Sequence, residues 1–418
     1  MRLNPSPPRD QEQRLQMLEQ DHVLRFWEEL DDAGRSTLLS DLEGIPHEAL
    51  EGILSEGVDA LRPALPPLDE LEAVTLAETN GPQNDPIRAL GDEELAAGRV
   101  AAVTVAGGQG TRLGFSGPKG TYPIEPSTGR SFFALIAEAI RRESLRSGHP
   151  IPWYVMTSDA THEQTVAFFK EHADFGLEAG QVRLFCQGTL PAISLEGRLL
   201  MLDKHRLVML PDGHGGLVEA LSRSGNLARM QEEGTRHLSV FQVDNPLVRW
   251  IDPTFLGLHA AGNADVSCKA IGKRDDQEGL GNLCVHRGRT MCIEYSDFPA
   301  EYASARNTDG TRRFDAGNIS IYVMAVAFLA RLVRDGVNLP IHLARKKIPV
   351  FEPGHGVREP AAPNAYKMER FLFDVLPHAR SVVVVRTRRE EEFAAAKTLT
   401  GPDSVETCRQ ALTRRANG

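Results

Sequence analysis

The sequence predicts an α/β protein with a mostly parallel, Rossmann-like central sheet and helices on both faces of the sheet. Short β-rich runs alternate with helical stretches from about residue 98 onwards, which is the signature of parallel strands joined by helical crossovers. A glycine-rich loop directly follows the first of these runs, at the carboxyl end of a strand, where ligands bind in such sheets. The β-rich runs cover residues 100–105, 153–156, 182–185, 238–243, 266–271 and 290–294, and helical periodicity covers 132–146 and 162–172.

The chain is expected to divide into three consecutive parts, because 418 residues exceed the size of one compact core. Residues 1–97 are expected to form a helical module and a linker, since apolar residues recur at helical spacing and a proline-rich stretch follows them. Residues 98–356 are expected to form the main α/β domain, and residues 357–418 a small α/β cap. Within that cap the pattern predicts a helix at 367–376, a strand at 381–386 and a helix at 404–415.

Composition and charge exclude several classes of function. A net charge of −10 argues against nonspecific binding to nucleic acid or to anionic lipid. Five cysteines without a CxxC pair argue against structural zinc and against a disulfide framework, and their odd number fits a reducing compartment. No apolar run of 18 residues and no signal-peptide pattern is present. We therefore expect a cytoplasmic protein with neither a membrane nor a nucleic acid as partner.

The loop that follows the first strand is the sharpest chemical signal. It contains Gly107, Gly108, Gly110 and Gly114, and residues without Cβ atoms allow backbone N–H groups to approach an anion or a base edge. Two cations, Arg112 and Lys119, stand within and just after the loop, and both side chains suit phosphate oxygens. The spacing fits neither the GxxxxGK[ST] motif nor the GxGxxG motif, so the usual nucleotide-binding motifs of those two types are excluded.

Two further places resemble ligand-binding sites. Asp244 ends an apolar run, where a carboxylate can hold Mg²⁺ against substrate phosphates, although Asp-Asn-Pro is also an ordinary turn sequence. A second glycine-rich loop, with Gly213 and His214, precedes a predicted helix at about Val218, and helix amino termini suit a base or a phosphate. His214 is either a donor to a ligand or a solvated loop histidine.

Nine ordered motifs together resemble the eukaryotic-type UDP-sugar pyrophosphorylases, and most closely the UDP-N-acetylglucosamine pyrophosphorylases. The resemblance spans residues 98 to 411 and includes Gly-Gln-Gly-Thr-Arg-Leu-Gly at 108–114 with Gly-Pro-Lys-Gly at 117–120. The other motifs are residues 153–158, 187–192, 211–217, 243–245, 294–296, 316–319, 346–349 and 367–371.

The resemblance implies a nucleotidyltransferase-type fold, with residues 98–356 as the catalytic domain, and a role for each site residue. It implies a uridylyltransferase that forms UDP-N-acetylglucosamine and pyrophosphate from UTP and N-acetylglucosamine 1-phosphate, by in-line attack on the α-phosphate and with Mg²⁺ or Mn²⁺. By resemblance, Gly107, Gly108 and Gln187 contact the uracil, Gly213 and His214 also belong to the nucleotide site, and Arg112, Lys119 and Lys367 hold the phosphates. Asp244 binds the metal, and Gly281, Glu294 and Asn318 hold the sugar.

Two positions leave open which sugar 1-phosphate is the substrate. His214 stands where N-acetylhexosamine enzymes typically have Asn and where relatives that use glucose 1-phosphate often have His. Asp315 likewise replaces an Asn, whereas the Ala-Gly-Asn-Ile motif with Phe314 and the Glu-Tyr-Ser motif at Glu294 have the N-acetylglucosamine form. The alternatives are a UTP–glucose-1-phosphate uridylyltransferase, a broad-specificity UDP-sugar pyrophosphorylase and a noncatalytic nucleotide-sugar sensor. A glycosyltransferase is disfavoured, since the sequence has no Asp-x-Asp triplet. The oligomeric state stays open.

Overall fold

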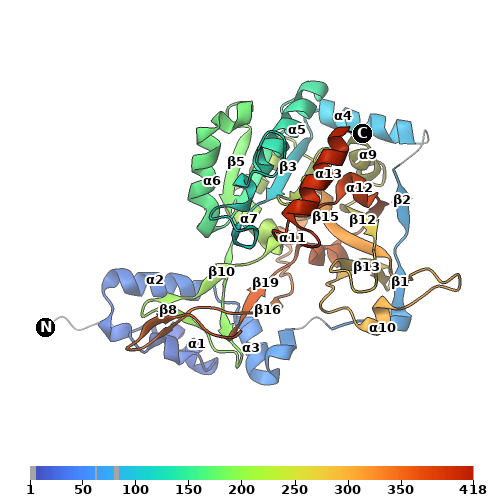
Figure 1. Cartoon of the computed structure of the whole chain (residues 1–418). Helices are drawn as coiled ribbons and strands as arrows, with labels where there is room; N and C mark the ends of the chain where they lie inside the picture. Colours follow the sequence, from blue (N-terminus) through green and yellow to red (C-terminus); the bar gives the residue numbers. More distant parts are fainter. Residues whose placement is uncertain (1–5, 62–63, 80–83, 418) are drawn as a thin grey trace. The chain divides into compact units, whose positions relative to one another are not determined.

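The computed structural model describes residues 6–61, 64–79 and 84–417, and it groups the chain into two compact units (Figure 1). The larger unit comprises Pro66–Gln187, Leu217–Val337 and Phe373–Gly418. The smaller unit comprises Met1–Leu65, Gly188–Gly216 and Asn338–Leu372. These units differ from the consecutive parts expected at 1–97, 98–356 and 357–418, because three separate stretches of chain gather in the smaller unit.

The larger unit is built on a mixed sheet in which most neighbouring strands are parallel, and this confirms the predicted sheet. Its main path is β2–β20–β12–β15–β11–β3–β4–β5. On this path β15 runs antiparallel to β12 and to β11, and the other neighbours are parallel. Strand β13 pairs with β1, β14 and the start of β15. The bounds are β1 Leu71–Ala73, β2 Leu76–Glu78, β3 Val100–Val105, β4 Trp153–Thr157, β5 Val182–Cys186, β11 His237–Gln242, β12 Val266–Gly272, β13 Gly281–His286, β14 Arg289–Ile293, β15 Ala316–Ala325 and β20 Val382–Arg386.

All six β-rich runs of the sequence form strands, whereas β1, β2, β13 and β15 of this sheet were not expected. Strand β15 lies in the middle of the sheet, but it contains Gly317 and Asn318, and both residue types are depleted in strands. Its pairing on both sides supplies the stability that local propensity does not.

Helices flank this sheet, as predicted. Helix α5 begins where Ser131 Oγ accepts a hydrogen bond from the backbone N–H of Ala134, and it ends at Gly148 in the left-handed conformation. Its apolar face packs with residues of β3, β4, α9 and α13 in one core, while α7, α8 and α11 pack together. The bounds are α4 Asp85–Ala96, α5 Phe132–Ser147, α6 Asp159–Glu171, α7 Leu217–Arg223, α8 Asn226–Glu232, α9 Pro253–Ala261, α10 Ala300–Ala303, α11 Val326–Arg334, α12 Arg389–Glu392 and α13 Val405–Asn417.

The carboxyl-terminal stretch extends the larger unit and does not form the separate cap that was expected. Strand β20, predicted from residues 381–386, pairs with β2 and β12 of the central sheet. Helix α13, predicted from residues 404–415, buries Val405 and Cys408 in the core below that sheet.

The smaller unit contains the helical module expected near the amino terminus, together with short strands from later in the chain. Its core gathers apolar side chains from all three stretches, including Leu38, Leu199 and Met368. The helices are α1 Arg9–Met17, α2 Asp32–Glu43 and α3 His47–Glu56, and the strands are β6 Thr189–Pro191, β7 Ile193–Ser194, β8 Met201–Asp203, β9 Arg206–Leu207, β10 Met209–Pro211, β16 His342–Lys346, β17 Val350–Glu352, β18 Gly356–Arg358 and β19 Ala365–Glu369.

The helix predicted at residues 367–376 is wrong. Lys367 lies in β19, which pairs with β16 and β7, and the pairing buries Ala365 and Met368. Only a 3-10 segment, Leu372–His378, follows, and it contains Pro377, which has no backbone N–H to continue a helix.

Candidate active site

The glycine-rich loop leaves the carboxyl end of β3 and folds back on itself. The backbone N–H of Lys119 donates to the carbonyl of Gly108 (2.9 Å), and that of Gly110 donates to the carbonyl of Gly117 (2.8 Å). Gly114 has a φ of +68°, which favours glycine. The Gly108 backbone is exposed, and a Cβ placed there would have no atom within 4 Å. The loop is thus internally braced and presents an open backbone edge at Gly108.

Gly107 lies against Gln187, as the resemblance implies for a uracil site. A Cβ on Gly107 would lie 2.2 Å from Gln187 Oε1, so a side chain here would force the end of Gln187 to move away. Ser158 Oγ donates to the Gly107 carbonyl (2.7 Å) and fixes the loop from the next strand. Because Gly107, Ser158 and Gln187 follow β3, β4 and β5, three adjacent parallel strands bring them to one edge of the sheet.

Lys119 and Asp244 form an ion pair at the same edge, although they are 125 residues apart. Lys119 Nζ lies 3.0 Å from Asp244 Oδ2, and the two side chains are 9% and 19% exposed. Burial raises the pKa of Asp244, but the charges of Lys119 and Lys397 outweigh burial and hold this pKa below its usual range. Asp244 is therefore a carboxylate at neutral pH. Arg112, by contrast, has an exposed side chain on the short turn Thr111–Leu113.

Lys397 is a cation of this region that sequence reasoning missed. It follows a segment that runs beside the Asp244 turn, where the Ala396 N–H donates to the Asp244 carbonyl (2.9 Å). No recognisable motif surrounds Lys397, so its proximity to Asp244 is visible only in the folded chain.

The three residues expected to hold a sugar are neighbours in the larger unit. Gly281 of β13 pairs directly with Asn318 of β15. A Cβ on Gly281 would lie 2.7 Å from Cys292 Sγ and 3.6 Å from Glu294 Oε2. The structure therefore brings Gly281, Glu294 and Asn318 together, across a sequence separation of 37 residues.

Tyr322 supports this cluster from below and was also missed. Its hydroxyl lies 2.8 Å from Asn318 Nδ2, which donates to it, and the Tyr322 side chain is 1% exposed. The contact depends on a bulge, because Cys268 pairs with Tyr322 while Ala270 pairs with Asn318, so that residues 319–321 face Lys269 alone. Such a bulge cannot be recognised from the sequence of β15.

The remaining predicted residues belong to the smaller unit. The loop with Gly213 and His214 lies against the end of β19, where His214 Nδ1 accepts from the Leu372 N–H (2.9 Å) and the ring stacks on Phe371. Burial, followed by the charge of His342, lowers the pKa of His214 to about 4. His214 is therefore neutral at pH 7 and keeps its proton on Nε2. Lys367 Nζ bonds to Glu369 (2.7 Å) in the same unit.

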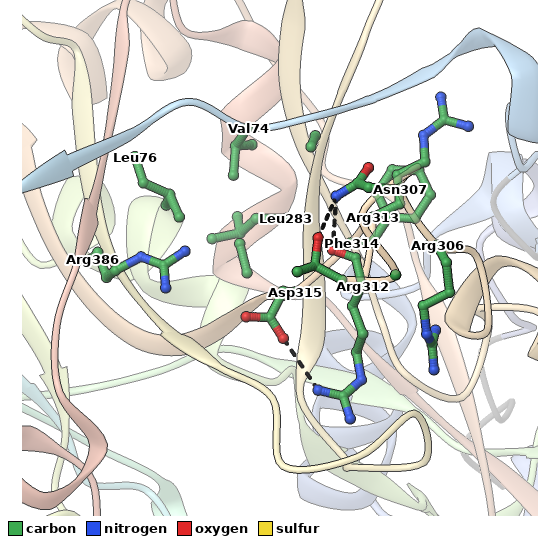
Figure 2. Close-up of a pocket in the computed structure, with 14 residues that line it drawn as sticks. Val74, Leu76, Leu283, Arg306, Asn307, Arg312, Arg313, Phe314, Asp315 and Arg386 are labelled. Carbon is green, nitrogen blue, oxygen red and sulfur yellow. Dashed lines mark hydrogen bonds and ion pairs between the residues drawn. The ribbon is translucent and has the colours of Figure 1, made fainter.

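Residues close in sequence to the sugar cluster, among them Leu283 and Ala316, line a cavity of about 590 Å³. Gly281, Glu294 and Asn318 themselves do not line it. Figure 2 shows Arg386 on the left of this view and Asp315 near its centre, between Arg386 and the Arg312 side chain with which Asp315 pairs. The Asp315 carboxylate also accepts from the Lys273 N–H (3.3 Å), so the Asp at this unexpected position has a structural partner.

A magnesium site at Asp244 fits the residues present. Among the described residues, no group of three or more His, Cys, Asp or Glu side chains is arranged to hold a metal ion. Mg²⁺ is commonly bound by one or two carboxylates together with substrate phosphates, which needs no such group.

In the part of the chain that the structure describes, no helix is both long and apolar enough to span a membrane.

Comparison with known families agrees with this geometry. The family model described as UTP–glucose-1-phosphate uridylyltransferase matches residues 70–400, which include the loop, Asp244 and the sugar cluster. The chain belongs to this family.

Individual relatives align with more than four-fifths of the chain. The human UDP-N-acetylhexosamine pyrophosphorylase-like protein 1 is 36% identical over 421 aligned residues, covering 96% of this chain and 82% of that protein. The UDP-N-acetylglucosamine pyrophosphorylase of Saccharomyces cerevisiae is 36% identical, covering 85% and 78%. A crystal structure of a protein described as a putative UDP-N-acetylglucosamine pyrophosphorylase from Entamoeba histolytica matches with a TM-score of 0.76 and 31% identity, covering 82% of this chain and 88% of that one.

Proposed function

We propose that this chain is a uridylyltransferase that forms UDP-N-acetylglucosamine and pyrophosphate from UTP and N-acetylglucosamine 1-phosphate. The observation that supports this most directly is the Lys119–Asp244 pair (3.0 Å), because it joins the glycine-rich loop to a carboxylate at the carboxyl edge of one sheet. The names of the relatives at 36% identity support the N-acetylated sugar.

The reaction needs no covalent intermediate. An oxygen of the sugar 1-phosphate attacks the α-phosphorus of UTP, the bond between the α-phosphorus and its bridging oxygen breaks, and pyrophosphate leaves. The protein aligns two anions that repel each other and neutralises charge in the transition state. Gly107, Gly108 and Gln187 would hold the uracil, and Arg112, Lys119 and Lys367 would hold phosphate oxygens.

Asp244 is the residue that would hold Mg²⁺ or Mn²⁺, which supplies charge neutralisation at the phosphates when bound. This carboxylate pairs with Lys119, and we propose that the lysine contacts a phosphate oxygen once the substrates are bound. Gly213 and His214, which belong to the smaller unit, are the other residues that we propose for binding the nucleotide. The five cysteines are all free thiols, which supports a reducing compartment and hence the cytoplasm.

Gly281, Glu294 and Asn318 would bind the sugar. A carboxylate can accept hydrogen bonds from two sugar hydroxyls, and an amide can both donate and accept. All of the residues named for phosphates and metal are intact, which disfavours a noncatalytic sensor.

Pyrophosphate release from UTP tests the proposal, measured in parallel with N-acetylglucosamine 1-phosphate, N-acetylgalactosamine 1-phosphate and glucose 1-phosphate. The highest kcat/KM is expected with N-acetylglucosamine 1-phosphate. A tenfold preference for glucose 1-phosphate corresponds to about 1.4 kcal/mol in transition-state binding. That result would identify the chain instead as a UTP–glucose-1-phosphate uridylyltransferase, the alternative that His214 suggests. Comparable values for all three sugars would indicate a broad-specificity enzyme, and no release with any of them would refute the proposal.

A further inference from the structure

Behind the Asp244 turn lies a fully buried cation that contacts no solvent. Lys269 of β12 is 0% exposed, and its Nζ lies 2.7 Å from Asp252 Oδ2 and 2.5 Å from Glu392 Oε1. Asp252 begins α9, where it accepts from the backbone N–H groups of Thr254 and Phe255. One ammonium thus joins a central strand, the start of a helix and the end of α12.

Such a group is costly unless every charge is paired. Burial lowers the pKa of Lys269, but the two carboxylates outweigh burial and hold it above its usual range. The same ammonium outweighs the effect of burial on Asp252 and keeps the pKa of that carboxyl low. The three side chains are therefore mutually dependent, and none of them can reach a substrate.

The backbone around Glu392 is bonded to the Asp244 turn. Asn245 Nδ2 donates to the Glu392 carbonyl (2.8 Å), and Asn245 Oδ1 accepts from the Ala394 N–H (3.0 Å). The Ala396 N–H donates to the Asp244 carbonyl (2.9 Å). These bonds place residues 392–396 alongside the turn, and Lys397 follows directly.

We propose that Lys269, Asp252 and Glu392 form a clamp that positions the Asp244 turn and the segment 392–397 for the reaction. The inference rests on the function proposed above, in which Asp244 acts at the substrate phosphates. In the sheet, Lys269 of β12 lies opposite the bulge at residues 319–321 of β15, between Asn318 and Tyr322. These three are positioning residues, since they act through Asp244, Asn245 and Lys397.

The variant Glu392→Gln tests this role. It retains the Glu392 carbonyl that Asn245 contacts and leaves Lys269 paired with Asp252, so the net charge of the three side chains changes from −1 to zero and no charge is left unpaired. We expect kcat to fall at least tenfold while the KM values for UTP and the sugar phosphate change less than threefold. Hydrogen exchange measured by mass spectrometry should show faster exchange at the amides of Ala394 and Ala396.

Glu94→Gln is the matched control. Glu94 is 8% exposed and bonds to Arg99 (3.1 Å) and His237 (3.1 Å), the latter at the start of β11 and so away from the carboxyl edge of the sheet. It should lose thermal stability as Glu392→Gln does but retain kcat. If Glu392→Gln retains kcat within threefold of this control, the clamp is merely structural and the proposal is overturned.

A second variant, Asn245→Ala, removes the bonds between turn and segment but leaves the three buried charges paired. It should reproduce the loss of kcat and the faster exchange at Ala394, and normal turnover in this variant would overturn the proposal even if Glu392→Gln did not fold. The exchange measurement does not depend on turnover. If the unaltered chain made no UDP-sugar, the proposed function would fail, while the exchange data would still report on the clamp.

Discussion

Replacing Lys119 by methionine tests the central pair of the proposed site. Methionine has a similar length but no charge, so Asp244 loses its hydrogen-bonded partner at 3.0 Å and retains only the more distant charge of Lys397. The loop itself should keep its shape, since the contact from Lys119 to Gly108 is made by the backbone N–H.

The magnitude follows from the burial of the pair. At 3.0 Å and an effective dielectric constant of about 20, the direct attraction is about 5.5 kcal/mol, and desolvation of both charges offsets part of it. Loss of one partner from a buried pair costs about 3–5 kcal/mol. Because Asp244 is 19% exposed, we expect a smaller cost, about 2–3 kcal/mol in the free energy of unfolding.

The loss of turnover should be larger than a lower fraction of folded protein alone would cause. A cation that meets phosphate charge developing in the transition state contributes a factor of about 10²–10³ to kcat. We therefore expect Lys119→Met to lower kcat by about that factor, with a smaller rise in the KM for UTP.

The pH dependence of stability gives an independent check. A carboxyl whose folded pKa is depressed contributes stability that is present above its unfolded pKa of about 4 and is lost as the pH falls through the folded value. The stability deficit of Lys119→Met should accordingly be complete at pH 7 and shrink below about pH 4.

Chemical denaturation and pyrophosphate release, measured on the same preparations, distinguish the two roles of Lys119. The double variant Lys119→Met/Asp244→Asn should regain stability, because it leaves no unpaired carboxylate, but should stay inactive. Turnover of Lys119→Met within fourfold of the unaltered chain, or turnover restored by the second substitution, would refute this reasoning.

Three further changes probe the other clusters. Gly107→Ala puts a Cβ 2.2 Å from Gln187 Oε1, so it should raise the KM for UTP at least tenfold and the KM for the sugar phosphate much less. An equal rise in these two KM values would contradict a uracil site at Gly107. Tyr322→Phe removes the hydroxyl that accepts from Asn318 Nδ2 (2.8 Å), and the KM for the sugar phosphate should rise about threefold to tenfold with that for UTP unchanged, an outcome that a variant altered only in stability would not give. Between about pH 6.5 and 4 the unfolded chain binds a proton at His214 that the folded chain does not, so the free energy of unfolding falls as the pH falls. His214→Gln should make this fall less steep. If denaturation at several pH values shows the same dependence in the variant and in the unaltered chain, His214 is not its cause.

Local pattern predicts part of the secondary structure. Each of the six β-rich runs forms a strand, and α5, α6 and α13 lie where helical periodicity indicates them, because their apolar faces have the period of the structure they adopt. The exceptions are informative. Strand β15 contains residue types that disfavour strands, and β19 takes residues 365–369 into a sheet because β16 and β7 are available to pair with them.

The proposed site likewise has some features that the sequence predicts and others that arise only in the folded chain. Glycine spacing, the two cations near the loop and Asp244 at the end of a strand are properties of short stretches, and the sequence by itself therefore sufficed to predict a phosphate-binding loop and a metal-binding carboxylate. The folded chain adds the pairing of Lys119 with Asp244, the place of Lys397 and the support that Tyr322 gives to Asn318.

Tertiary structure alone decided which distant residues meet. Lys269, Asp252 and Glu392 are unremarkable charged residues in the sequence, where such residues are usually solvated, yet all three are buried and paired. A charge can be buried only where partners from other elements surround it, and that depends on sheet order and strand register. The chemistry of the glycine-rich loop was thus visible in a few consecutive residues, whereas the arrangement that positions its partner carboxylate arises only when strands far apart in the chain become neighbours.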